Sequence, residues 1–439
     1  MSMTLLRRLG LALAGAGVAF ALVACGGGGD GDGGGGDASV RLLNVTNDIA
    51  ALDLYSEEDD EEAVRSEGVG RDAVGDYFSL KADTYNFLVK RAGADATLLQ
   101  QTSRSVSGGN KYTVIAYGYE GAYKSALLSE NEDDSPASGK TKIRVLNLSA
   151  DAGNLDIYVT DADTPLSDAS PVIASLDGGS VSAYATVTSG NRRIRVTAAG
   201  DNADLRLDIP AATLESTGIV NVVLTPGNGG VLVHGYLMPQ GGDLTLAKNT
   251  QSRVRLVSSV TSTGSVGAAV NGTTLATAQS SPSVGGYANV TAGALTGTFT
   301  VNGVAITTPT ATLVAGNDYS LMVAGDPGAS SVYVIGDDNR LPTTTKKAKF
   351  RLFNGVPTET AGLSLQVNLN PLADGVAFGA ASTATQVDAA ADSTIEVNSG
   401  LGSTVYSRTD QDIAEQGVYS VFLLAGNPAG STGLLRKER

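Results

Sequence analysis

The chain has 439 residues, of which 45 are Asp or Glu and 30 are Lys or Arg, so its formal net charge is −15. A surface of that sign repels phosphate backbones and anionic headgroups, which excludes nucleic acid as the expected partner and an electrostatic hold on a membrane. With one Cys and one His in the whole sequence, intramolecular disulfides and the usual zinc clusters are excluded as well.

The N-terminus carries an export signal that ends at the single cysteine. Arg7 and Arg8 precede an apolar run at residues 9–24, which has the length of a secretory signal and is too short to cross a bilayer stably. The run closes on Leu-Val-Ala-Cys, which resembles the lipobox of bacterial lipoproteins. That resemblance implies a signal peptide at residues 1–24 and acylation of Cys25, with palmitate as one such lipid. Two or three acyl chains hold a protein firmly at a membrane. The alternative is a membrane-spanning helix in which Cys25 is inert.

Residues 26–37 contain only Gly and Asp. Such a segment has no apolar side chain to bury and a high backbone entropy to lose, so we predict a flexible tether over residues 25–38, with a span of about 20 Å. Its aspartates lack the closing bidentate Glu of a calcium loop, and no metal site is predicted there. An Asp directly after the cysteine resembles an inner-membrane retention signal of lipoproteins. Gly26 stands there instead, which favours the outer membrane of a Gram-negative cell.

Four copies of one unit follow the tether. The clearest motif places an arginine between apolar residues, three positions before an Asn or Ser. The arginines of the four copies are Arg41, Arg144, Arg255 and Arg351. They stand 103, 111 and 96 residues apart, which is one small domain each time.

Two further motifs recur at similar offsets inside the copies. Leu-Asp-Leu-Tyr at residues 52–55 matches Leu-Asp-Ile-Tyr at 155–158, with weaker counterparts at 266–269 and 363–366. An apolar strand led by Gly closes each copy, at residues 109–117, 218–224, 316–324 and 417–424. Tyr112, Tyr319 and Tyr419 hold equivalent places in three of these closing strands.

Within each copy apolar residues alternate with polar ones, as at residues 194–196 and 205–209, which is the period of a strand with one buried face. Turn signals such as Asn-Gly at residues 271–272 and 302–303 separate the strands. The pattern predicts an all-β chain of tandem immunoglobulin-like antiparallel β-sandwiches. The arginine of each first strand is expected on the solvent side, between buried neighbours.

These motifs resemble the bacterial family of domains of unknown function 4397. The first two copies carry the arginine strand and the Leu-Asp strand best, the third lacks the Asp and Tyr of the second motif, and the fourth departs most. The resemblance implies a β-sandwich found in exported and surface proteins, with no established activity and no catalytic residues. We place the four domains at residues 39–135, 141–245, 252–342 and 348–435.

No motif for catalysis or for a cofactor stands out. His234, the only histidine, is interpreted as an ordinary strand residue, and the sequence contains no Gly-x-Ser-x-Gly elbow. Gly68, Gly70 and Gly75 are too loosely spaced for a phosphate-binding loop. Paired carboxylates could serve a glycosidase, but their proximity is not encoded in the order of the residues. We therefore predict no catalytic residues, no metal and no cofactor.

Two acidic runs, at residues 57–62 and 130–134, are predicted as exposed loops or linkers, because dense like charges repel one another. The alternative is a weak calcium site, although the spacing matches no EF-hand loop.

Tyr117, Tyr119 and Tyr123 cluster beyond what a strand needs for its core, and they are the best candidate contact patch. The alternative is an ordinary strand end and hairpin. Together these features predict an exported structural or binding lipoprotein, anchored in the cell envelope through Cys25 and facing an envelope protein or a glycan as partner. The second hypothesis is a carbohydrate-active or otherwise hydrolytic surface protein.

Overall fold

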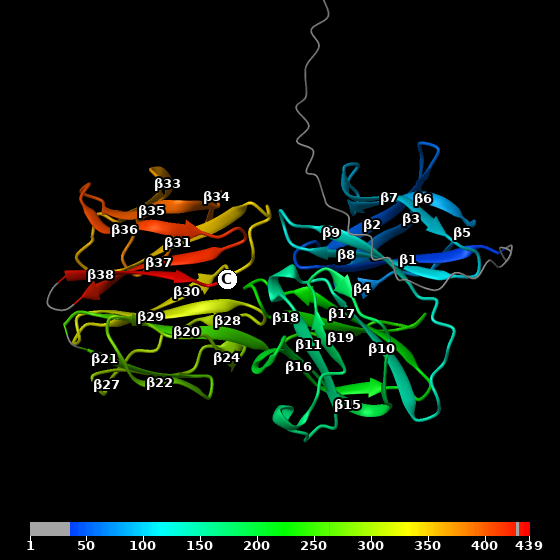
Figure 1. Ribbon diagram of the computed structural model, residues 1–439, viewed down its shortest axis with the longest axis horizontal. Coiled ribbons are helices and arrows are strands. Elements are labelled where there is room, and N and C mark those ends of the chain that lie inside the picture. Colours follow the sequence, from blue (N-terminus) through cyan, green and yellow to red (C-terminus); the bar gives the residue numbers. More distant parts are fainter. Residues whose placement is uncertain (1–35, 263, 427–429) are drawn as a thin grey trace, which may run out of the picture. The chain divides into compact units, whose positions relative to one another are not determined.

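The computed structural model describes residues 36–262, 264–426 and 430–439 (Figure 1). The predicted signal peptide, Cys25 and most of the predicted tether lie outside these residues. The chain divides into two compact units, unit 1 up to Glu130 and unit 2 from Asn131 to Arg439. Among the described residues, no helix combines the length and the apolar character needed to cross a membrane.

Strands make up nearly all the regular structure of both units. Unit 1 is one β-sandwich (sandwich 1), and unit 2 contains three (sandwiches 2 to 4). Besides strands, the described residues form two single 3-10 turns, η1 (Ala150–Ala152) and η2 (Leu166–Asp168). The predicted all-β fold of tandem sandwiches is confirmed, whereas the exact domain boundaries stay a prediction.

The strands of each sandwich run consecutively along the chain. Sandwich 1 consists of β1 (Ala38–Thr46), β2 (Ala51–Glu58), β3 (Glu61–Gly70), β4 (Ala73–Val74), β5 (Phe78–Leu80), β6 (Asp83–Arg91), β7 (Thr97–Val106), β8 (Lys111–Gly118) and β9 (Lys124–Ser129). Sandwich 2 consists of β10 (Lys140–Asn147), β11 (Leu155–Thr160), β12 (Ile173–Leu176), β13 (Ser180–Val181), β14 (Ala185–Thr188), β15 (Gly190–Ala198), β16 (Asp201–Leu214), β17 (Ile219–Pro226), β18 (Val233–Pro239) and β19 (Thr245–Ala247).

The other two sandwiches follow the same plan. Sandwich 3 consists of β20 (Gln251–Val260), β21 (Ser265–Val270), β22 (Thr273–Ser280), β23 (Ser283–Val284), β24 (Ala288–Thr291), β25 (Gly293–Ala294), β26 (Gly297–Val301), β27 (Val304–Ile306), β28 (Thr312–Leu313), β29 (Asp318–Gly325) and β30 (Ser331–Asp337). Sandwich 4 consists of β31 (Lys347–Gly355), β32 (Leu363–Val367), β33 (Asn370–Val376), β34 (Thr385–Asp388), β35 (Ala390–Ser399), β36 (Thr404–Ile413), β37 (Val418–Gly426) and β38 (Gly430–Lys437).

Each sandwich has one sheet that contains its first strand, here called the first sheet, and a second sheet opposite. In sandwich 1 the first sheet has the order β4-β1-β8-β9 and the second sheet β3-β2-β6-β7. The first strand pairs in parallel with the closing strand in all four copies, as β1–β8, β10–β17, β20–β29 and β31–β37. The sequence did not reveal this parallel pair, because it joins strands from opposite ends of a repeat.

The core of each sandwich lies between its two sheets. β1 contributes Val40 and Leu42, and β2 contributes Leu52 and Leu54, all 0% exposed. Alternate residues of a strand point to the same face, so these pairs enter the core together. Equivalent positions fill the cores of the other three sandwiches.

The first-strand arginines lie on the other face of the first sheet, yet they are buried. Arg41, Arg144, Arg255 and Arg351 are 3%, 6%, 0% and 3% exposed. The expectation that they face solvent is wrong. Strand periodicity gives only the face on which a residue lies, whereas aromatic and acidic side chains such as Tyr77 and Glu130, which lie outside the strands, cover this face.

Sandwiches 3 and 4 pack against each other through the outer faces of their first sheets. Val257 and Met322 of sandwich 3 meet Phe353, Phe422 and Leu424 of sandwich 4 in a cluster of buried apolar residues. The rings of Phe353 and Phe422 stack with their centroids 4.4 Å apart. A second core therefore joins these two sandwiches inside unit 2.

We expect Phe422→Ala to lower the free energy of unfolding of unit 2 by roughly 3–5 kcal/mol, because it leaves a cavity in this second core. Denaturant unfolding of the purified chain measures the effect. The control is Leu401→Ala, at a side chain that is 89% exposed. A loss for Phe422→Ala as small as that of the control would contradict the packing described.

Candidate functional site

The asparagine of the first-strand motif caps a buried turn. Asn44 is 0% exposed, and its Nδ2 donates to the carbonyls of Val69 at 3.1 Å and Ile49 at 3.4 Å. Asn147 and Asn354 bond backbone groups in the same way in sandwiches 2 and 4. These bonds satisfy backbone groups that burial would otherwise leave unpaired, so the motif serves the fold.

The aspartate of the second motif also has a structural role. Asp53 accepts hydrogen bonds from the N–H groups of Gly68 at 2.7 Å and Gly93 at 3.0 Å. In sandwich 2, Asp156 does the same for Ser175 and Gly200. One buried carboxylate thus links the second strand to two neighbouring segments. Hydrogen bonds to a carboxylate are charge-assisted and therefore stronger than those between neutral groups.

The tyrosines of the closing strands form tyrosine corners. The hydroxyl of Tyr112 accepts from the N–H of Ser107 at 3.1 Å. Tyr319 and Tyr419 accept from Val314 at 3.0 Å and from Ala414 at 2.9 Å. In all three copies the donor lies five residues upstream, so the tyrosine fixes the loop that enters the closing strand.

Each first-strand arginine lies against an aromatic ring. The guanidinium carbon of Arg41 is 4.3 Å from the ring centroid of Tyr77, and the corresponding distances are 4.6 Å for Arg144 over Tyr184 and 4.5 Å for Arg255 over Tyr287. In sandwich 4, Arg351 lies 4.6 Å from the ring of Phe353. A cation over an aromatic face is favourable, and the ring keeps water from the guanidinium.

Buried carboxylates complete these clusters. Glu130 lies 3.2 Å from Arg41 and accepts the Tyr77 hydroxyl hydrogen bond at 3.0 Å. The residue is 3% exposed, so the prediction of an exposed linker over 130–134 is wrong for Glu130. A buried carboxylate at this position is stable because the positive charge of Arg41 neutralises it. The acidic run in the sequence does not indicate this partner.

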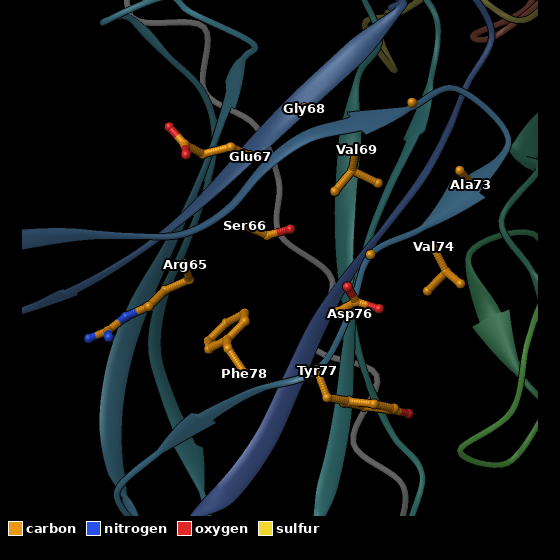
Figure 2. Close-up of a pocket in the computed structure, with 12 residues that line it drawn as sticks. Arg65, Ser66, Glu67, Gly68, Val69, Ala73, Val74, Asp76, Tyr77 and Phe78 are labelled. Carbon is orange, nitrogen blue, oxygen red and sulfur yellow. The ribbon is translucent and has the colours of Figure 1, made fainter.

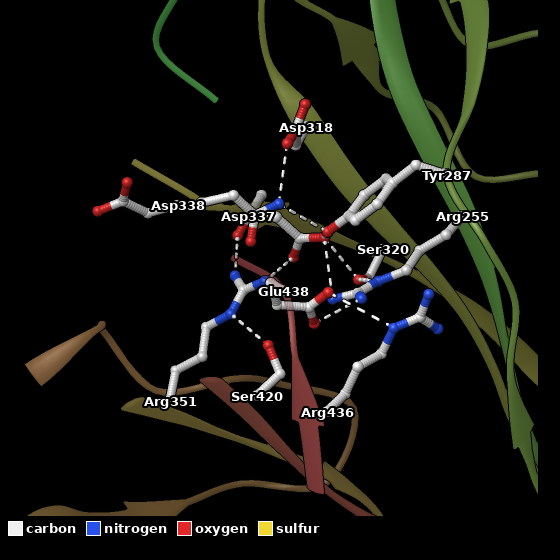
Figure 3. A network of polar contacts seen from close by, with 12 residues as sticks. Arg255, Tyr287, Asp318, Ser320, Asp337, Asp338, Arg351, Ser420, Arg436 and Glu438 are labelled. Carbon is white, nitrogen blue, oxygen red and sulfur yellow. Dashed lines mark hydrogen bonds and ion pairs between the residues drawn. The ribbon is translucent and has the colours of Figure 1, made fainter. Parts of the chain in front are cut away.

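The densest cluster joins sandwiches 3 and 4 (Figure 3). Asp337 forms ion pairs with Arg351 at 2.8 Å and Arg255 at 3.4 Å, and Arg255 also pairs with Glu438 at 2.7 Å. Ser320 donates to Asp337 at 2.7 Å. Ion pairs therefore cross between the two sandwiches. Arg255 of sandwich 3 pairs with Glu438 of sandwich 4, and Arg351 of sandwich 4 pairs with Asp337 of sandwich 3. This network holds the charged groups in place and offers none of them to a substrate.

A second ion-pair cluster lies beside this network. Asp338 accepts a hydrogen bond from Arg340 at 2.8 Å and pairs with Lys349 at 2.9 Å. Burial alone would raise the pKa of Asp338, but these cations outweigh burial and lower the pKa to about 2. Burial lowers the pKa of Lys349.

An open groove lies at one edge of sandwich 1, where the two sheets part (Figure 2). It has a volume of about 560 Å³ and runs between β3 of the second sheet and the β4–β5 segment of the first. Gly75 shapes it, because a Cβ at this position would come within 3.0 Å of Ser66 Oγ and Val69 Cγ2. Gly68 and Gly70 line the groove as well, so the structure brings together three glycines that look unrelated in the sequence.

The groove combines aromatic and hydrogen-bonding side chains. Phe78 is half-buried between the strands, and Arg65, Glu67 and Asp76 are exposed around it. The Tyr77 ring forms part of the wall (Figure 2). Burial first, and then the negative charge of Glu130, raise the pKa of Tyr77, so its hydroxyl stays neutral and keeps donating to Glu130.

The three tyrosines predicted as a contact patch lie in different surroundings. Tyr117 on β8 is 6% exposed, and burial raises its pKa to about 12. Tyr123 packs partly against the core of sandwich 1 and donates to Asp48 at 2.6 Å, while Tyr119 is half-buried. Their role as a contact patch for a partner stays a prediction. Tyr117 is buried, so a ligand cannot reach most of its side chain.

The acidic run at residues 57–62 forms a hairpin rather than a loop. Its residues belong to β2, β3 and the turn between them, where Asp59 and Asp60 have φ of 49° and 64°. Glu62 pairs with Lys90 at 2.5 Å. In the part of the chain that the structure describes, no cluster of three or more acidic, His or Cys side chains is arranged to hold a metal ion. His234 lies on β18, as expected of a strand residue, and its Nδ1 accepts from the N–H of Asn249 at 3.2 Å.

The family described as "Domain of unknown function (DUF4397)" matches residues 38–158 and 252–361, just over half of the chain. Each matched segment spans one sandwich and continues toward the second strand of the next. No curated protein matches the chain.

Three solved structures are similar at low identity. They are the Bacillus anthracis TIE protein (10% identity, 65% of this chain and 50% of that one, TM-score 0.15), the family CBM26 module CBMbc from Eubacterium rectale Amy13K in complex with maltoheptaose (13%, 48% and 96%, 0.15) and the fimbrial anchor protein Mfa2 from Porphyromonas gingivalis (12%, 48% and 99%, 0.17). The chain thus spans half the length of the TIE protein. TM-scores this low support no conclusion about function.

We expect Asp337→Ala to lower the free energy of unfolding of unit 2 by roughly 3–5 kcal/mol, because two buried guanidinium groups lose their shared carboxylate. Asp388→Ala is the control, since Asp388 pairs with Lys347 while its side chain is 77% exposed. That exposed pair is worth about 0–1 kcal/mol. Denaturant unfolding measures both variants. If the two variants lose equal free energy of unfolding, the buried network does not stabilise unit 2 as described.

The lowered pKa of Asp338 predicts an acid-dependent contribution to stability. Since the pKa is about 2 in the folded state and 3.8 for the free side chain, the contribution is complete above about pH 5 and is lost as the pH falls from 4 to 2. We expect Asp338→Asn to cost about 1 kcal/mol at pH 6, because solvent screens a side chain that is 37% exposed. The difference from the unmodified chain should disappear near pH 2 in denaturant titrations, and a difference that stays constant with pH would refute the assignment.

Proposed function

This chain belongs to the family described as a domain of unknown function (DUF4397), and from that premise we propose that it is a non-enzymatic binding protein of the cell envelope. A lipid on Cys25 holds it at the membrane, and the Gly/Asp tether separates the lipid from sandwich 1. The sandwiches act as a frame, and the groove of sandwich 1 receives the ligand. The observation that carries the proposal is the chemistry of that groove.

The groove suits a neutral, hydroxyl-rich ligand such as an oligosaccharide. Its exposed charges are of both signs, with Arg65 beside Glu67 and Asp76, so the groove offers hydrogen-bond donors as well as acceptors. Carboxylate and guanidinium groups bond sugar hydroxyls as acceptors and donors. Phe78 adds an aromatic surface for the apolar face of a sugar ring. A volume of about 560 Å³ is in the range of small-ligand sites.

The recurring motifs support a binding role rather than a catalytic one. The repeated asparagines, aspartates and arginines are buried and bonded within the fold. Groups that are already paired have no spare capacity to activate a substrate. The charged groove residues Arg65, Glu67 and Asp76, in contrast, are exposed and belong to none of the recurring motifs.

A second candidate is hydrolysis of a glycan, because Glu67 and Asp76 both line the groove and a glycosidase uses two carboxylates. Incubation of the purified chain with the bound glycan separates the candidates. Intact glycan supports the binding protein. Product formation that Glu67→Gln or Asp76→Asn abolishes would support the hydrolase instead.

We expect Gly70→Phe to abolish glycan binding by filling the groove. Gly70 lines the groove, a Cβ there meets no atom within 4 Å, and the backbone is not in the left-handed region, so the side chain is accommodated without strain. Gly286→Phe in sandwich 3 is the matched control, because it has the same open surroundings. A glycan array identifies the ligand, and calorimetry compares the variants.

The double variant Glu67→Ala/Asp76→Ala tests the hydrogen bonds separately. Both residues are exposed, so the fold should tolerate the change. We expect at least a tenfold loss of affinity, in line with about 1.5–3 kcal/mol for a bond to a charged group. If a glycan binds to Gly70→Phe and to the double variant as tightly as it binds to the unmodified chain, its site is not this groove.

A further inference from the structure

Sandwich 3 carries a sheet face on which the outward side chains are small and uncharged. In its second sheet, β22-β21-β26-β27, alternate residues of β21 and β26 point into the core, and those between them point outward. The cross-strand register places Gly267 opposite Thr300 and Ala269 opposite Thr298. We call this outer surface the threonine face, and it consists of Gly267, Ala269, Thr274, Thr298, Thr300 and Ala305.

The threonine face is exposed and flat. Thr274 and Thr298 are exposed, and no side chain of the face is larger than threonine. Gly267 keeps the middle of the face low, because a Cβ there would come within 2.5 Å of Thr300 Oγ1 and 2.8 Å of the Thr277 carbonyl oxygen. The first sheet of sandwich 3 packs against sandwich 4, so the threonine face lies on the other side of the sandwich.

Charge distinguishes this face from the same face of the other sandwiches. The strand equivalent to β26 carries an outward-facing Lys90 in sandwich 1, Arg193 in sandwich 2 and Glu396 in sandwich 4. In sandwich 3 the outward residues of this strand are threonines, and residues 256–317 include no Asp, Glu, Lys, Arg or His. This charge-free segment contains the whole second sheet of sandwich 3.

The lack of charge indicates which partner this face fits. The whole chain has a net charge of −15, so two copies repel each other. When a two-fold axis pairs a surface with itself, any charged residue near the axis faces a like charge, which is unfavourable. A foreign protein imposes no such limit, because opposite charges across the contact can fix its orientation. A face without charges on an acidic chain therefore fits a second copy of the same chain.

We propose that the threonine face is a self-association surface, on which a second copy of this chain packs face to face about a two-fold axis. Side chains no larger than threonine let the two sheets approach closely. Threonine methyl groups supply apolar contact, and threonine hydroxyls donate and accept hydrogen bonds across the axis. Because a β-branched side chain has few rotamers, little side-chain entropy is lost on contact. This surface is separate from the groove of sandwich 1 and does not depend on the function proposed for it.

Sedimentation velocity of the purified chain over a series of concentrations tests the proposal. We expect a reversible dimer whose fraction rises with concentration. The fraction should also rise with sodium chloride, because salt screens the repulsion between two chains of the same net charge. A chain that stays monomeric at every concentration overturns the proposal, and glycan binding that Thr298→Lys abolishes would then assign the face to a glycan.

Thr298→Lys places a like charge on each side of the axis, so we expect it to weaken dimerisation about tenfold or more. Ser407→Lys is the matched control, because Ser407 is exposed on the outer face of the second sheet of sandwich 4, opposite Glu396. Both positions are exposed strand residues, and denaturant unfolding checks that each variant folds like the unmodified chain. The proposal is overturned if Thr298→Lys dimerises as tightly as Ser407→Lys.

A mixture of Thr298→Lys with Thr298→Glu tests the symmetry of the contact. Each variant alone brings like charges together, whereas a dimer of one variant with the other brings opposite charges together. We expect the mixture to recover the dimer that each variant loses. A mixture that stays as monomeric as its components would overturn the face-to-face arrangement.

Discussion

The interaction on which unit 2 depends most is the burial of the Arg255 guanidinium between two sandwiches. It is 0% exposed, and its charge is met by Glu438, Asp337 and the ring of Tyr287. A buried charge is acceptable only while its partners stay in place, and separating the sandwiches would take Glu438 away from Arg255 and Arg351 away from Asp337. The apolar contacts around Phe353 and Phe422 supply the attraction, and the ion pairs fix the orientation in which the faces meet.

The fold was predictable because its signals are local. Period-two patterns, Asn-Gly turns and recurring strand motifs each specify a few consecutive residues, and together they specify sandwiches. The parallel pair of β1 with β8 and the burial of Arg41 could not be predicted, since both depend on residues far away in the chain. Glu130 makes the same point, because its partner Arg41 is 89 residues distant and an acidic run alone suggests only solvent.

The candidate site was harder to predict than the fold. The groove of sandwich 1 arises where the edge strands of two sheets part, and no motif marks such an edge. Gly68, Gly70 and Gly75 were the available signal, but their spacing resembled nothing with a known mechanism. The cluster of tyrosines at 117, 119 and 123 was a stronger signal in the sequence, yet Tyr117 is buried.

The division between frame and edge follows from where hydrogen bonds are needed. Inside a sandwich every buried polar group requires a partner, so Asn44, Asp53 and Tyr112 have fixed tasks and the motifs that contain them recur from copy to copy. At the parting edges of the sheets water can satisfy the backbone, and side chains there are free to differ. One such edge carries an aromatic residue with mixed charges, and the threonine face of sandwich 3, which is also exposed, carries small uncharged side chains. A chain of similar sandwiches can therefore present different chemistry on each sandwich without altering the frame that holds it.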